Sequence, residues 1–143
     1  MNEYNVKAIN DAYKNAHIAL QSIADLLPSV EHHSLKTELK GQYEGYDSII
    51  REMSNFMLSK NITPKDINFF KKAMLWSSIK MKVAMNNSKN QIAEMMINGT
   101  VMGINELTAM INEGENLLSE VKELIEKLLS LEEDYEQRLK EYL

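Results

Sequence analysis

The run Ile92-Ala-Glu-Met-Met-Ile-Asn-Gly-Thr-Val-Met-Gly-Ile-Asn-Glu-Leu107 decides the fold class, because its apolar residues recur at helical spacing. Gly99 and Gly103 lie one turn apart, and a missing side chain lets a neighbouring helix approach closely. The run therefore predicts a helix of a packed bundle, with close helix contacts at both glycines. The residues expected on its apolar face are Ala93, Ile97, Thr100, Ile104, Leu107 and Ile111.

The composition favours helices along the whole chain. The 143 residues include only five glycines and two prolines, whereas Leu, Met, Ala, Glu and Lys, which favour helices, are abundant. This length suits one four-helix bundle with helices of about 25 residues. We expect an all-α protein with a single domain over residues 1–143.

Two helices are expected in the first half of the chain. Apolar residues at alternating steps of three and four predict a helix from about Asn5 to Leu27, which Pro28 ends. The same spacing predicts a second helix that starts near residues 31–34 and ends at about Ser59. The connection between them is short, so we expect the two helices to form an antiparallel hairpin.

The second half contains a long helical segment from Pro64 to about Asn112. Because it is about twice as long as the other helices, we expect a break at residues 86–88. A crossover helix at 69–85 would then precede a third bundle helix at 88–112, and one unbroken helix is the alternative. Gly114 marks a turn before a fourth helix at about 115–142.

The blocks Trp76-Ser-Ser-Ile-Lys-Met-Lys82 and 92–103 resemble a group of small uncharacterised bacterial proteins in the ferritin-like superfamily. The resemblance implies a ferritin-like four-helix bundle with a helical crossover between the second and third bundle helices. Metal-binding members hold two metal ions with glutamates and Glu-x-x-His motifs. This chain contains no Glu-x-x-His, so we expect no metal centre or other cofactor.

A divergent metal site is the alternative to that expectation. Carboxylates on three expected helices would converge inside the bundle and hold iron or another divalent metal. The residues of this alternative are Glu44, Asp47, Glu94, Glu132 and Glu136.

Several polar and aromatic residues fall at interior or boundary positions of the predicted helices. The candidate interior polar cluster consists of Tyr13, His17, Gln42, Tyr46 and Tyr135. A second alternative is a pocket for a small ligand around four of them, Tyr13, Gln42, Tyr46 and Tyr135.

The expected crossover carries Phe69, Phe70 and Trp76, which suit an exposed apolar interface. We therefore expect a homo-oligomer, with a dimer favoured. The lysine-rich stretch of residues 65–89 has no arginine, so nucleic-acid binding is not expected.

The chain lacks cysteine, a run of apolar residues long enough to span a membrane, and the common catalytic motifs. We therefore expect a cytoplasmic protein outside the membrane, and catalysis is not favoured. The leading hypothesis is a non-catalytic helical bundle that acts through self-association or protein binding.

Overall fold

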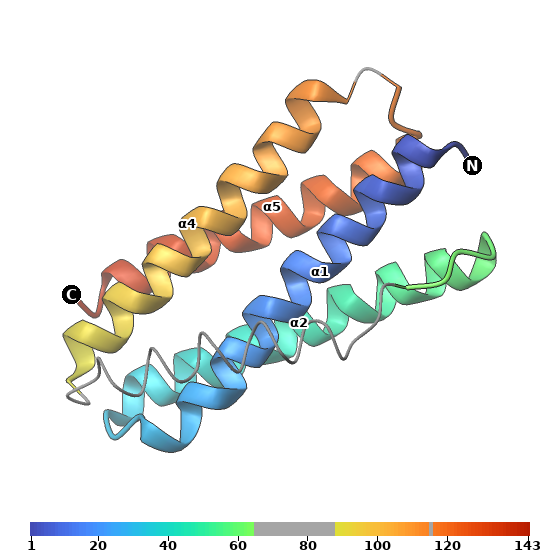
Figure 1. The fold of residues 1–143 in the computed structure, drawn as a ribbon. Helices are drawn as coiled ribbons and strands as arrows, with labels where there is room; N and C mark the ends of the chain where they lie inside the picture. Colours follow the sequence, from blue (N-terminus) through green and yellow to red (C-terminus); the bar gives the residue numbers. More distant parts are fainter. Residues whose placement is uncertain (65–87, 115) are drawn as a thin grey trace.

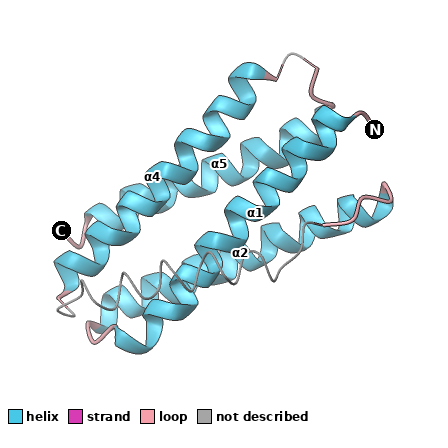
Figure 2. Cartoon of the chain, viewed as in Figure 1, coloured by secondary structure: helices cyan, strands magenta, loops and turns pink. Residues whose placement is uncertain are grey.

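The structure is a computed structural model that describes residues 1–64, 88–114 and 116–143. These residues form four long helices and one 3-10 turn, and no strand occurs among them (Figures 1 and 2). The prediction of an all-α protein is confirmed. The elements are α1 (Glu3–Leu26), η1 (Leu27–Ser29), α2 (His33–Ser59), α4 (Lys89–Glu113) and α5 (Ser119–Lys140).

The helices pack mainly as two pairs, α1 with α2 and α4 with α5, and α1 and α5 also contact helices of the other pair. In Figure 1, α1 and α5 run in one direction along the bundle, and α2 and α4 run in the opposite direction. The first residue of α4 therefore lies at the opposite end of the bundle from the last residue of α2. No described helix has a stretch that is long and apolar enough to cross a bilayer.

The predicted helix boundaries hold in the first half of the chain and at the start of α4. The first helix ends just before Pro28, and α2 ends at Ser59 as predicted. Ser88 has an extended backbone, and its hydroxyl accepts a hydrogen bond from the Gln91 amide at 3.3 Å. A new helix thus begins at Lys89, so a single unbroken helix over 64–112 is wrong. The crossover predicted at 69–85 lies outside the described residues.

The start of the last helix differs from the prediction, because α5 begins at Ser119 and not near residue 115. The buried Asn5 of α1 explains the difference. Its Oδ1 accepts a hydrogen bond from the Leu118 amide at 2.8 Å, and its Nδ2 donates to the Asn116 carbonyl at 3.3 Å. This contact between distant parts of the chain fixes where α5 starts.

The apolar core is drawn from all four helices. On α4 the buried face overlaps the predicted one in part, because Ala93, Thr100 and Leu107 are buried as predicted. Ile97, Ile104 and Ile111 are only half-buried, and Ile92 and Met96 are buried instead.

The two glycines of α4 have different surroundings. A Cβ added at Gly103 would collide with Glu132 Oε1 of α5 and lie 3.3 Å from Asn15 Nδ2 of α1. Gly103 therefore lies at a close contact, as predicted. The prediction for Gly99 is wrong, because no heavy atom lies within 4 Å of the place that its Cβ would take. Gly99 is exposed.

Candidate functional site

Glu132 is a buried acid in the middle of the last helix. The apolar stripe of α5 advances in steps of four and three residues, and Glu132 occupies the core position between Leu128 and Tyr135. Its side chain is 1% exposed. An acid at such a position loses its hydration, which is unfavourable. A hydrogen-bond partner usually offsets this cost, and a buried acid without one is a candidate functional residue.

Glu132 faces α1 and α4. Gly103 leaves the space that the carboxyl occupies, and Asn15 Nδ2 also lies beside the position that a Cβ of Gly103 would take. Asn15 Nδ2 donates to the Gly103 carbonyl at 3.2 Å and to Glu106 Oε2 at 3.5 Å. The three helices therefore meet at a small polar group inside an otherwise apolar bundle.

Two acceptor atoms of this group are buried without a hydrogen-bond donor among the described residues. They are Glu132 Oε1 and Asn15 Oδ1. Leaving a buried polar atom unsatisfied costs about 1–3 kcal/mol. Buried atoms of this kind are rare in folded proteins.

Burial changes the acidity of Glu132. Loss of hydration, with a smaller contribution from the nearby Glu106 carboxylate, raises the pKa of Glu132 from 4.5 to about 8. Burial also raises the pKa of Glu106, and burial together with Glu132 raises the pKa of Tyr46 well above 10. At pH 7 most molecules therefore carry Glu132 as the neutral acid.

A cavity of about 410 Å³ opens beside this carboxyl, between α1 and α4. Glu132 and Tyr46 are its most deeply buried lining residues, whereas Gly99 and Met102 are exposed and mark its mouth. A volume of this size falls in the range of small-molecule sites, about 300–1,000 Å³. The other lining residues are Asn15, Ile18, Ala19, Ser22, Met95, Met96, Thr100, Gly103 and Glu106.

Two hydroxyl groups among the lining residues of this cavity already donate hydrogen bonds within the protein. The Ser22 hydroxyl donates to the Ile18 carbonyl at 2.8 Å, and the Thr100 hydroxyl donates to the Met96 carbonyl at 2.7 Å. Both hydroxyl protons are thus engaged within their own helices. The buried acceptors without donors, Glu132 Oε1 and Asn15 Oδ1, are therefore the strongest polar features of the cavity.

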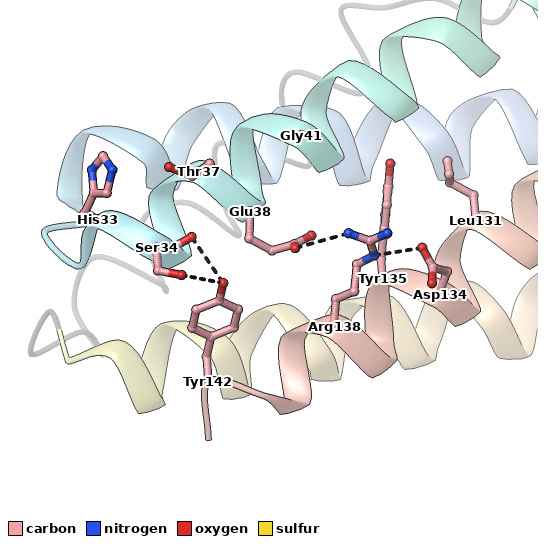
Figure 3. A pocket seen from close by; sticks show the side chains of 10 residues that line it. All are labelled: His33, Ser34, Thr37, Glu38, Gly41, Leu131, Asp134, Tyr135, Arg138 and Tyr142. Atoms are coloured by element: carbon pink, nitrogen blue, oxygen red, sulfur yellow. Dashed lines mark hydrogen bonds and ion pairs between the residues drawn. The ribbon is translucent and has the colours of Figure 1, made fainter.

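A second hollow, of about 680 Å³, lies between α2 and α5 and is drawn in Figure 3. Three charged residues of this hollow form ion pairs. Arg138 Nε lies 3.0 Å from Asp134 Oδ2, and Arg138 Nη1 lies 3.6 Å from Glu38 Oε1. The Tyr142 hydroxyl likewise pairs with Ser34, through Oγ at 3.0 Å and the carbonyl at 3.2 Å. A polar ligand would have to break these contacts, so this hollow is the weaker candidate.

The predicted polar residues lie at interior or boundary positions. Tyr13, Gln42, Tyr46 and Tyr135 are buried, and His17 is half-buried. Four of these residues form two pairs of aromatic rings. The ring centroids of Tyr13 and His17 lie 4.5 Å apart, and those of Tyr46 and Tyr135 lie 5.4 Å apart.

Gln42 takes a further partner, because its Nε2 donates to Glu38 at 3.0 Å. Of the predicted cluster, Tyr46 alone lines the cavity beside Glu132. Tyr135 lines the hollow between α2 and α5 instead, so a pocket built around Tyr13, Gln42, Tyr46 and Tyr135 together stays a prediction.

The alternative metal site is wrong. Within residues 1–64, 88–114 and 116–143, no three acids or histidines come together as a metal site. Glu44 and Glu94 are exposed, and Glu132 is buried away from them. Asp47 pairs with Arg51 at 2.9 Å, and Glu136 pairs with Lys140 at 3.1 Å.

The predicted interface residues Phe69, Phe70 and Trp76 lie outside the described residues, so the homo-oligomer stays a prediction. The comparisons with known proteins add no relative: no family model, no curated protein and no solved structure matches the chain.

Proposed function

We propose that this protein binds a small, mainly apolar molecule in the cavity beside Glu132. The observation that carries the proposal is a cavity lined by Glu132, a buried acid whose Oε1 has no donor among the described residues. Protein binding through a flat surface would not account for a hollow of this kind.

The polar and apolar parts of the cavity suit a small ligand. Such sites combine apolar walls with a few polar groups that set the orientation of the ligand. Here Ile18, Ala19 and Met96 supply apolar wall, and Glu132 and Asn15 supply the polar groups. The cost of their unsatisfied acceptors would be relieved when a ligand binds.

We also propose that the bundle has the ferritin-like connection. The parallel directions of α2 and α4 in Figure 1 support it, since that topology has one long connection in the middle of the chain. A non-catalytic role is the simplest one for this arrangement, because the cavity has one deeply buried acid and the described residues place no nucleophile–base pair in it.

Two glycines offer a matched test. Neither Gly99 nor Gly41 has a heavy atom within 4 Å of the position of an added Cβ, so both positions tolerate a side chain. Gly99 lines the cavity on α4, whereas Gly41 lines the hollow between α2 and α5. A leucine at Gly99 would obstruct the cavity, and a leucine at Gly41 would leave it open.

The probe is N-phenyl-1-naphthylamine, an apolar dye whose arylamine nitrogen stays uncharged and whose fluorescence increases in apolar surroundings. We expect one dye molecule per chain, with about tenfold weaker binding to Gly99→Leu and unchanged binding to Gly41→Leu. Ser22→Leu, which narrows the cavity from the α1 side, should weaken binding similarly. Equal binding by all four proteins, or no binding to the unmodified chain, would contradict the proposal.

A further inference from the structure

The Glu132 cavity has a second property that narrows the class of ligand, and this inference rests on the proposed function. Two of its polar atoms lack partners among the described residues: Asn15 Oδ1, which is an acceptor, and Glu132 Oε1, which is an acceptor once Glu132 is ionised. A third acceptor group, the Glu106 carboxylate, lines the same cavity nearer to solvent. A complementary ligand must therefore bring several donors and no competing acceptor.

A protonated primary amine has this character, because an ammonium group has three donors and no acceptor. Its charge also suits the cavity, because the ionisable residues among its described lining are two acids and a tyrosine, and none of these described residues is basic. Lys7 and Lys14 of α1 act on Glu106 from outside the lining, and Asp11 opposes them. None of these three charged groups lines the cavity.

Three methionines of the cavity indicate the chemistry of the part of the ligand that lies beyond the amine. Met95, Met96 and Met102 all lie on the α4 side of the cavity. Thioether side chains are flexible and polarizable, and they make favourable contacts with aromatic rings. An aromatic body thus fits the wall better than a hydrated or strongly polar one.

We propose that the cavity binds an arylalkylamine, with its ammonium held by Glu132, Glu106 and Asn15 and its ring packed against the methionines of α4. The ammonium stabilises the ionised form of Glu132, so the carboxyl releases its proton to the solvent when the amine binds. The raised pKa of Glu132, about 8, supports this coupling. Tyr46 stays neutral throughout, because its pKa is well above 10.

The experiment is isothermal titration calorimetry with three probes of similar shape and different charge. They are 2-phenylethylamine as the cation, 2-phenylethanol as the neutral analogue and 3-phenylpropionate as the anion. At pH 7 we expect the amine to bind about tenfold more tightly than the alcohol and the anion to bind most weakly. Titrations in buffers with different ionisation enthalpies should show proton release with the amine and none with the alcohol.

Three variants test which carboxyl group of the protein holds the ammonium group of the probe. Glu132→Gln keeps the shape of the side chain and should remove the preference for the amine and the proton release, while binding of the alcohol is unchanged. Glu106→Gln, at the exposed mouth, should weaken amine binding by a smaller factor, and it is available should Glu132→Gln fail to fold. Glu133→Gln removes the same charge from an exposed site on α5 and should change nothing.

The outcomes separate this inference from the proposed function. An alcohol that binds as tightly as the amine, or an amine preference that survives in Glu132→Gln, would overturn the inference alone. No binding by any of the three probes would also overturn it. The proposed function is tested separately by the dye and the glycine variants.

Discussion

Gly103 of α4 lies against the carboxyl of Glu132 on α5, and the absence of a side chain at Gly103 makes the space for that buried acid. The glycine at position 103 thus permits the burial of the Glu132 carboxyl. Since a buried acid without a partner lowers stability, the pair is better explained by ligand binding than by packing.

The first prediction concerns this contact. Gly103→Leu should lower the free energy of unfolding by about 1–3 kcal/mol, because the new side chain collides with Glu132 and crowds Asn15. Gly99→Leu should leave stability unchanged or raise it by up to about 1 kcal/mol, since leucine favours helices and the site is open. Urea denaturation measures both. Equal effects of the two substitutions would show that Gly103 is not at a close contact.

The second prediction concerns the carboxyl itself. Glu132→Met keeps the approximate length of the side chain and removes an unsatisfied acceptor, so it should raise the free energy of unfolding at pH 7 by about 1–3 kcal/mol. The same variant should lose binding of the amine probe. A loss of stability in this variant would mean that the carboxyl has a stabilising partner.

The third prediction is the pH dependence of stability. The pKa of Glu132 is about 8 in the folded protein and 4.5 ordinarily, so the folded state holds one more proton than the unfolded state between these values. The contribution of Glu132 to stability is therefore most favourable below pH 4.5, decreases as the pH rises and is lowest above pH 8.

Between pH 4.5 and pH 8, the free energy of unfolding of the unmodified chain should therefore decrease relative to that of Glu132→Gln. The decrease should be at most about 1.4 kcal/mol per pH unit. Urea denaturation of both proteins at pH 5, 6.5 and 8 provides the comparison. A constant difference between them at the three pH values would contradict the raised pKa.

The fourth prediction concerns the start of α5. Asn5→Ala removes the acceptor for the Leu118 amide and the donor to the Asn116 carbonyl, so it should destabilise the fold by about 1–3 kcal/mol. Asn98→Ala, at an exposed position of α4, is the control and should have no such cost. If the two substitutions have the same effect, Asn5 does not fix the start of α5.

Much of the fold follows from local sequence signals. The spacing of apolar residues located α1 and α2, and Pro28 and Ser88 marked a helix end and a helix start through effects that act within one turn. The start of α5 did not follow, because it depends on Asn5, which is more than a hundred residues away in sequence.

The site was less predictable than the fold. The stripe of α5 has an apparent gap between Leu128 and Tyr135, and Glu132 lies at that core position, so the sequence does contain a signal for a buried acid. The pattern of acids instead placed Glu132 among the five residues of the alternative metal site. Gly99 and Gly103 lie one turn apart on nearly the same side of α4, and which of them meets a side chain of another helix depends on packing that the sequence alone does not determine.

The central claim, a ligand cavity beside Glu132, is tested most directly by methyl NMR of protein labelled at its ten methionines. Neutral 2-phenylethanol is the probe, because it tests the cavity without testing the preference for charge. The account predicts ring-current shifts at Met95, Met96 and Met102, which line the cavity, and none at the buried Met53 and Met57, which do not. Unchanged signals at Met95, Met96 and Met102 at saturating probe, or equal shifts at all five, would contradict it.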